Sequence, residues 1–298
     1  MTSLRGIQQH VEGLGDIRAV MNSMKALAYI ETQKLSGIVP AQRAVTAQLD
    51  VAALDLLAHY PEILPAAVPP RHAWIVLGTE RGFCGNLNQQ LLERLASETA
   101  DAAPEEDGAV LLVGRKLHTA FEDDQRTRTI LVEGAGVTEE APAVLNRIAD
   151  ELDALRRSHG PAAVSAICFD SEGRLGVRNL LPPFRDVQTQ KAAHAQKPLL
   201  NLSPHRLLVD LIDQYLFSSI FEILYGSLLT ENDRRVKHLG DAVRYLDKQC
   251  VDLTHRANAL RQEQITEEIE VLLLSAGTTE DGARKSPQRT RGNIGPGS

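Results

Sequence analysis

The residues that could carry chemistry gather in one short stretch, TERGFCGNLN at 79–88, directly after an apolar run that reads as a strand. Its glycines could cradle a phosphate at the start of a helix. Cys84, close to Arg81, could be a reactive thiol, because a nearby cation lowers a thiol pKa. The glycine spacing matches neither G-x-x-x-x-G-K-[ST] nor G-x-G-x-x-G, however. We therefore predict a tight strand-to-helix turn that needs positive φ, with Cys84 as a structural residue.

No other set of residues predicts catalysis, cofactor binding or metal binding. The nine histidines include no H-E-x-x-H pattern. The three cysteines, Cys84, Cys168 and Cys250, are far apart, so they form no CxxC metal motif and no disulfide framework. We expect no cofactor and no metal, and a protein that is not itself an enzyme.

Charge and hydropathy limit the kinds of partner that the chain is expected to contact directly. The formal net charge is −7, which gives the chain as a whole no electrostatic footprint for nucleic acid. The most apolar stretch, residues 207–229, is interrupted by Asp210, Asp213, Gln214 and Glu222. It therefore does not read as a membrane span, and no segment reads as a signal peptide. Any contact with a membrane is expected to come through a partner.

The middle of the chain alternates short apolar runs with helix-like segments. Such alternation is typical of an α/β domain with a parallel sheet. The apolar runs occupy 73–78, 109–114 and 163–169, with a weaker one at 128–133. The helix-like segments occupy 86–98, 114–122 and 139–157.

The N-terminal region predicts an amphipathic helix over residues 3–36. Its apolar residues recur in steps of three and four, which places them on one stripe. We expect Gly37 and Pro40 to interrupt this helix, because proline lacks an amide donor and clashes with the preceding turn. A second helical stretch is predicted over 41–59.

The C-terminal region predicts a long helix over 204–276, with Ser203 as N-cap and Pro204 at its first position. At ~1.5 Å per residue it would be ~110 Å long. Apolar residues follow a strict heptad spacing, which is typical of a left-handed coiled-coil seam. These are Val236, Leu239, Val243, Leu246, Cys250, Leu253, Ala257 and Leu260. The polar, Gly- and Pro-rich segment 277–298 is expected to be a disordered tail.

Neither terminal helix can bury its apolar stripe alone, so we expect the two to pack against each other. The predicted fold is α/β: an antiparallel coiled coil of N- and C-terminal helices plus a Rossmann-like α/β domain with a mainly parallel sheet. The predicted segments are 1–60 (N-terminal coiled-coil helix), 71–200 (α/β foot domain), 204–276 (C-terminal coiled-coil helix) and 277–298 (tail).

The 79–88 stretch resembles the S/T-D/E-R-G-L-C-G-x-L-N signature of the γ subunit of F-type ATP synthases. Further matches lie at Met24-Lys25-x-Leu27-Ala28, at Thr230-Glu231 with Arg235, and in the segment 258–269. The resemblance covers residues 3–277. Departures include Tyr29-Ile30-Glu31-Thr32, where the family is Ala-rich with several basic residues, and Arg234, where a small residue is usual.

The resemblance implies a non-catalytic central stalk that couples ion flow to ATP synthesis or hydrolysis. It implies as partners the α and β catalytic subunits, the ε subunit and the membrane c-type ring, with no nucleic acid. It also implies a peripheral location on the cytoplasmic face of a bacterial cell membrane. The implied partner-binding residues are Met24, Lys25, Arg81, Arg235, Arg261, Gln262 and Glu268. From spacing alone, Met24 reads as a core residue and Lys25 as its solvated neighbour, while Arg261, Gln262 and Glu268 read as a solvated coiled-coil face.

Three other interpretations stay open at this point. The departures are compatible with a sodium-translocating or alternative F-type ATPase. An enzyme would bind its substrate at the carboxyl ends of the predicted strands. A stand-alone coiled-coil scaffold would explain the heptads but not the 79–88 stretch.

Overall fold

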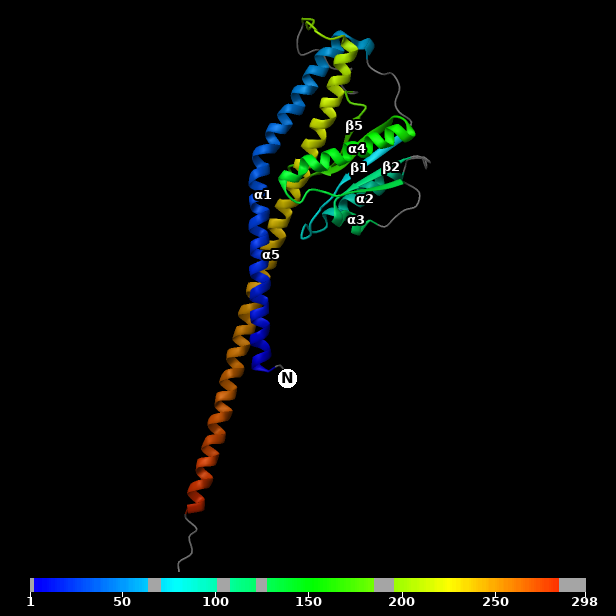
Figure 1. Ribbon diagram of the computed structural model, residues 1–298. Helices are drawn as coiled ribbons and strands as arrows, with labels where there is room; N and C mark the ends of the chain where they lie inside the picture. The colour runs from blue at the N-terminus through cyan, green and yellow to red at the C-terminus, as the bar shows by residue number, and fades with distance from the viewer. Residues whose placement is uncertain (1–2, 64–70, 101–107, 122–127, 185–195, 284–298) are drawn as a thin grey trace, which may run out of the picture. The chain divides into compact units, whose positions relative to one another are not determined.

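The computed structural model describes residues 3–63, 71–100, 108–121, 128–184 and 196–283, with side chains up to residue 273. Figure 1 shows the helices and strands with their labels. The chain divides into two compact units. Unit 1 comprises residues 1–20 and 242–298, and unit 2 comprises residues 21–241.

Unit 2 contains a five-stranded sheet of order β3-β2-β1-β4-β5. Strands β1 to β4 run parallel, and β5 runs antiparallel to β4. The strands are β1 (Arg71–Leu77), β2 (Ala109–Val113), β3 (Arg128–Val132), β4 (Ala162–Phe169) and β5 (Leu175–Leu181). The first four agree with the predicted runs, and the mainly parallel Rossmann-like sheet is confirmed. The fifth strand was not predicted, because its sequence LGVRNLL has neither a continuous apolar run nor strict alternation.

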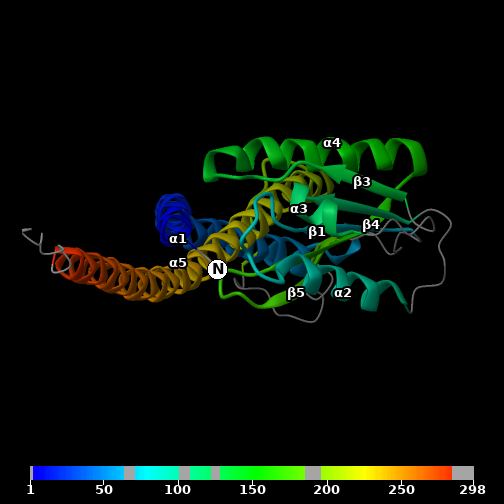
Figure 2. The same ribbon diagram turned by 90° about the horizontal axis from the view of Figure 1, so that it is seen from below.

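Helices cover both faces of the sheet. In Figure 2, α4 (Ala141–His159) lies along one face and α2 (Leu87–Ala100) along the other. The face toward α4 packs Ile75, Leu111 and Ala166 against Val144 and Ile148. The opposite face packs β1, β2 and β4 against α2 and the short α3 (Arg115–Ala120). We call the sheet with α2, α3 and α4 the sheet domain.

Helix α1 (Leu4–His59) is continuous, and the predicted interruption at Gly37 and Pro40 is wrong. A short 3₁₀ turn, η1 (Pro61–Ile63), follows it. Proline inside a helix removes one hydrogen bond and crowds the preceding turn, at a cost of about 3 kcal/mol. Here Pro40 is exposed, while Leu35, Val39 and Thr46 on the same helix are buried. Burial on both sides of Pro40 offsets this local cost, so the helix continues.

Helix α5 (Pro204–Ala283) is also continuous. Its start is as predicted, because the hydroxyl of Ser203 accepts a hydrogen bond from the amide of Arg206 at 3.4 Å. It continues past residue 276, so the first part of the segment predicted as a tail is helical. Residues 284–298, the rest of that segment, lie outside the described residues.

The two long helices run side by side in opposite directions within unit 2, where the amide of Gln42 donates to Ser218 Oγ at 2.9 Å. Nearby, Ala53, Leu56 and Leu57 of α1 share an apolar cluster with Leu208 and Tyr215 of α5. Within unit 1, Arg18 of α1 forms an ion pair with Asp247 of α5. The predicted antiparallel pairing of the N- and C-terminal helices is confirmed.

The heptad residues face inward. Leu239, Val243, Leu246 and Ala257 are buried, and the other four are half-buried. Beyond them, every side chain from 261 to 273 is exposed. Several of these exposed residues are large and apolar, namely Ile265, Ile269, Val271, Leu272 and Leu273.

Candidate functional site

The 79–88 loop joins the carboxyl end of β1 to the start of α2. It contains positive φ values at Phe83 (66°) and Gly85 (65°), which is the tight turn predicted from the sequence. The Asn88 side chain closes the loop on itself. It accepts from the Thr79 amide at 3.0 Å and donates to the Thr79 hydroxyl at 2.9 Å. At Gly85 the space for a Cβ is occupied by the ring of His238 from α5.

Glu80 ties the loop to two neighbouring turns of the sheet domain. Its buried carboxylate accepts hydrogen bonds from the amides of Arg115 (3.0 Å) and Gly134 (2.9 Å), and from Nε of Arg115. Burial alone would raise the pKa of this carboxyl, but the hydrogen bonds from Arg115 and Gly134 lower it below its usual value. Glu80 is therefore an ionised anchor for backbone amides.

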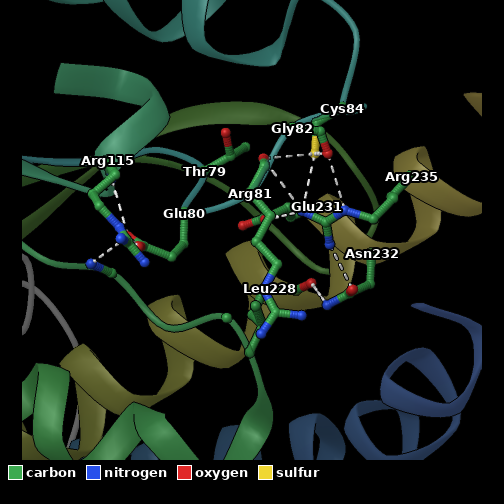
Figure 3. A network of polar contacts seen from close by, with 12 residues as sticks. Thr79, Glu80, Arg81, Gly82, Cys84, Arg115, Leu228, Glu231, Asn232 and Arg235 are labelled. Carbon is green, nitrogen blue, oxygen red and sulfur yellow. Dashed lines mark hydrogen bonds and ion pairs between the residues drawn. The ribbon is translucent and has the colours of Figure 1, made fainter. Parts of the chain in front are cut away.

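Arg235 of α5 holds the other side of the loop, as Figure 3 shows. Its guanidinium donates to the carbonyls of Gly82 (3.1 Å) and Arg81 (3.4 Å). It also donates to Asn232 Oδ1 at 2.8 Å and to Cys84 Sγ at 3.3 Å, and it pairs with Glu231. Arg235 is only 4% exposed. Removing one partner from a buried ion pair costs about 3–5 kcal/mol, so this contact strongly constrains the loop.

Two groups beside Arg235 have strongly shifted pKa values. Burial raises the pKa of Glu231 to about 7, although Arg235 and the amide of Arg81 oppose the shift. Burial and the Glu231 charge raise the pKa of the Cys84 thiol to about 12, although Arg235 and Arg234 oppose it. A thiol with so high a pKa carries almost no thiolate at neutral pH. Cys84 is thus the structural residue that the sequence favoured over a reactive thiol.

Helix α5 occupies the part of the sheet where an enzyme of this topology would bind its ligand. In open α/β sheets, ligands bind outside the carboxyl ends of the strands where the strand order reverses, here between β1 and β4. At that point Ser227 donates to the carbonyl of Leu77 at 3.4 Å, and Thr230 donates to the carbonyl of Asp170 at 2.6 Å. The arrangement suits a fixed joint between helix and sheet better than a substrate pocket.

The seven residues expected to bind partners lie in different settings. Arg235 is buried inside the chain, where it braces the loop. It contacts the backbone of Arg81, whose own side chain is exposed and lies against Gly136. Met24 and Lys25 are half-buried on α1 in unit 2. The remaining three, Arg261, Gln262 and Glu268, are exposed on α5 in unit 1.

The sequence also contained residues whose bracing role we did not predict. The i, i+4 spacing of Glu231 and Arg235 on a helix could have indicated their ion pair. No local signal identified the contact of Glu80 with Arg115 or that of Glu31 with Thr138, because these partners lie 35 and 107 residues away along the chain.

The described part of the chain offers neither a membrane-spanning helix nor a cluster of metal-binding side chains. No helix there is both long and apolar enough to cross a membrane. Within the same residues, no three His, Cys, Asp or Glu side chains gather as a metal site would require.

A family model, two curated relatives and a solved structure similar to this chain all carry the name ATP synthase. A family model described as ATP synthase matches residues 3–276. The chain is 23% identical to the ATP synthase gamma chain of Pelotomaculum thermopropionicum, over 94% of this chain and 100% of that one. It is 26% identical to the ATP synthase gamma chain of Mycolicibacterium vanbaalenii, over 94% and 98%. Its fold is similar to that of a chain in the Euglena gracilis mitochondrial ATP synthase (OSCP/F1/c-ring, rotational state 3). The TM-score is 0.58 at 17% identity, covering 98% of this chain and 99% of that one.

Proposed function

Because the chain belongs to the ATP synthase family, we propose that it works as the γ-type central-stalk subunit of a rotary F-type ATP synthase. The observation that carries this proposal is the family match over residues 3–276, which spans both long helices and the sheet domain between them. The chain is a mechanical part of the complex, and catalysis belongs to other subunits.

The paired helices suit a part that rotates inside a ring of three α/β pairs. A single asymmetric object cannot make equal contacts with three equivalent sites, so each site is biased toward a different nucleotide affinity. The stalk can bias a site only by the difference in its contact free energy with the two conformations of that site. About 1.4 kcal/mol of such a difference corresponds to a tenfold change in nucleotide affinity. Exposed residues near the end of α5, including Arg261, Gln262 and Glu268, are available for such contacts. We propose the same role for Met24 and Lys25 on α1.

The sheet domain is the part proposed to meet the ε subunit and the membrane c-type ring. Arg81, exposed at the edge of the 79–88 loop, is our candidate for a contact there. The chain would then be a peripheral component attached to the membrane through its partners. We place it on the cytoplasmic face of a bacterial cell membrane.

Affinity purification from cells that produce the α, β and ε subunits tests this proposal. The tagged chain should co-purify with α and β in a complex that hydrolyses ATP. The triple variant Arg261→Ala, Gln262→Ala, Glu268→Ala should assemble but synthesise ATP more slowly. Recovery of the chain alone, or only with copies of itself, would rule out the stalk role in favour of an enzyme or a scaffold.

A further inference from the structure

The two long helices differ in the apolar packing that attaches them to the sheet domain. Ile220, Ile223 and Leu224 of α5 belong to the apolar cluster on one face of the sheet. No described residue of α1 belongs to either of the two clusters that flank the sheet. Polar side chains of α1 therefore have a large share in fixing it to the sheet domain.

The strongest of these polar contacts is made by Glu31, which is 8% exposed. Its Oε2 accepts hydrogen bonds from the amide of Thr138 at 2.8 Å and from the Thr138 hydroxyl at 2.7 Å. Its Oε1 accepts from Lys34 at 2.8 Å, and Lys34 also donates to Glu139 at 2.9 Å. Burial would raise the pKa of Glu31, but the hydrogen bonds from Lys34 and Thr138 outweigh it and lower the pKa. The carboxylate is thus ionised at neutral pH, when its hydrogen bonds are strongest.

The segment that receives Glu31 connects β3 to α4 and is held by carboxylates at regular spacing. The amides of Gly134, Gly136 and Thr138 donate to three different glutamates. The first, Glu80, comes from the 79–88 loop, and the second, Glu140, immediately precedes α4. The third is Glu31 of α1, so this segment connects the loop to the long helix.

We infer that Glu31 is a positioning residue for energy coupling: it clamps α1 to the β3–α4 segment so that, within unit 2, α1 and the sheet domain turn together. This inference rests on the proposed stalk function. If the sheet domain receives torque from the membrane ring and the helices deliver it to the catalytic ring, slippage between them dissipates that torque. The Glu31 clamp resists slippage of α1, whereas α5 is held by apolar packing together with the hydrogen bonds of Ser227, Thr230 and Arg235.

The clamp itself can be measured in the isolated full-length chain. Hydrogen exchange at the Thr138 amide should be about tenfold or more faster in Glu31→Ala than in the wild type, because the amide loses a buried charged acceptor. Gln33→Ala, a change at an exposed position two residues away, should leave that exchange rate unaltered.

The coupling role requires the assembled complex in sealed vesicles. The measured quantity is ATP-driven ion uptake divided by ATP hydrolysed. We expect this ratio to fall at least about twofold in Glu31→Ala and by a smaller amount in Thr138→Val, which removes one of the hydrogen bonds to a charged acceptor. Thr138→Ser, which restores the hydroxyl, should return the ratio to normal. A residue that only stabilises the fold would instead lower the yield of complex and leave the ratio unchanged.

The outcomes separate the clamp from the stalk function. Faster exchange at Thr138 with an unchanged ratio would overturn the coupling role of Glu31. Unchanged exchange in Glu31→Ala would overturn the clamp itself. Failure of the wild-type chain to assemble with α and β would instead overturn the proposed function, while the exchange measurement would still report on the clamp. If Glu31→Ala does not assemble, the comparison of Thr138→Val with Thr138→Ser decides the coupling role.

Discussion

The buried polar residues in the 79–88 loop and on the part of α5 beside it brace the chain. Glu80, Glu231 and Arg235 are each at most 7% exposed, and each satisfies backbone or side-chain groups of the loop or its neighbours. The two glutamates are in opposite electrostatic situations, because the pKa of Glu80 is lowered and the pKa of Glu231 is raised. The raised pKa of Glu231 gives a testable dependence of stability on pH.

Between pH 4 and 7, folded chains hold a proton on Glu231 that unfolded chains, with a glutamate pKa of about 4.3, release. The contribution of this proton to stability is complete below the unfolded pKa and is lost as pH rises through about 7. We therefore expect the free energy of unfolding of the wild type, minus that of Glu231→Gln, to decrease as pH rises from 4.5 to 7. It should then be constant above pH 8. Urea titrations at several pH values measure it.

Glu80→Gln provides a control in which the pH dependence of the stability contribution has the opposite sign. The pKa of Glu80 is lowered in the folded chain, so its contribution to the free energy of unfolding is fully present above the ordinary glutamate pKa. This contribution is lost as the pH falls from the ordinary glutamate pKa through the lowered one. A wild-type-minus-variant difference for Glu231→Gln that does not change with pH would show that Glu231 titrates as an ordinary glutamate.

At the scale of elements, the pairing of the two long helices depends on residues that neighbour one another in sequence but differ in burial. Leu246 on α5 is 9% exposed, whereas the side chain of Asp247 is 46% exposed and pairs with Arg18. An exposed ion pair contributes only about 0–1 kcal/mol. The seam residue should therefore matter far more than its neighbour.

We expect Leu246→Asp to destabilise the chain by at least ~3 kcal/mol, through lost apolar burial and an unpaired buried charge. Asp247→Ala should cost at most about 1 kcal/mol. Thermal unfolding of the chain and ion-gradient-driven ATP synthesis by the complex measure both effects. Equal behaviour of the two variants would mean that residues 236–260 do not form the seam.

Sequence periodicity predicted the elements well where one face of an element is buried. The heptads of α5 and the apolar runs of β1, β2 and β4 follow directly from that rule. Periodicity failed at Pro40, where burial elsewhere on α1 overrides a local breaker, and at β5, an edge strand with weak apolar character. It could not predict the contact of Glu31 with Thr138, because nothing local specifies a hydrogen bond across 107 residues.

At the scale of the whole molecule, a single chain supplies both the long helices and the sheet domain, and the structure shows how they are joined. α5 crosses the carboxyl ends of β1 and β4, where Ser227 and Thr230 bond to the sheet. The same contacts remove the site at which a doubly wound sheet would bind a nucleotide. The architecture therefore favours mechanical connection over ligand binding.

We accordingly expect the isolated chain to bind ATP with a dissociation constant weaker than about 1 mM and to show no ATPase activity, since it has no phosphate loop. Calorimetric titration with Mg-ATP measures the affinity, and phosphate release measures the activity. Micromolar binding would mean that a nucleotide site exists elsewhere in the chain.

The antiparallel pairing of α1 with α5 has a consequence for synthesis on the ribosome. The helix that ends at His59 finds its partner only after the chain from Pro204 onward has been made. The 145 residues from His59 to Pro204 take roughly 7 to 29 s at about 5–20 residues per second, and for at least that time the apolar stripe of α1 is uncovered. Meanwhile the first four strands and their helices are complete by Phe169 and can fold. The nascent chain thus carries a folded domain next to an unpartnered amphipathic helix, and that helix is the segment a chaperone must shield until translation of α5 is finished.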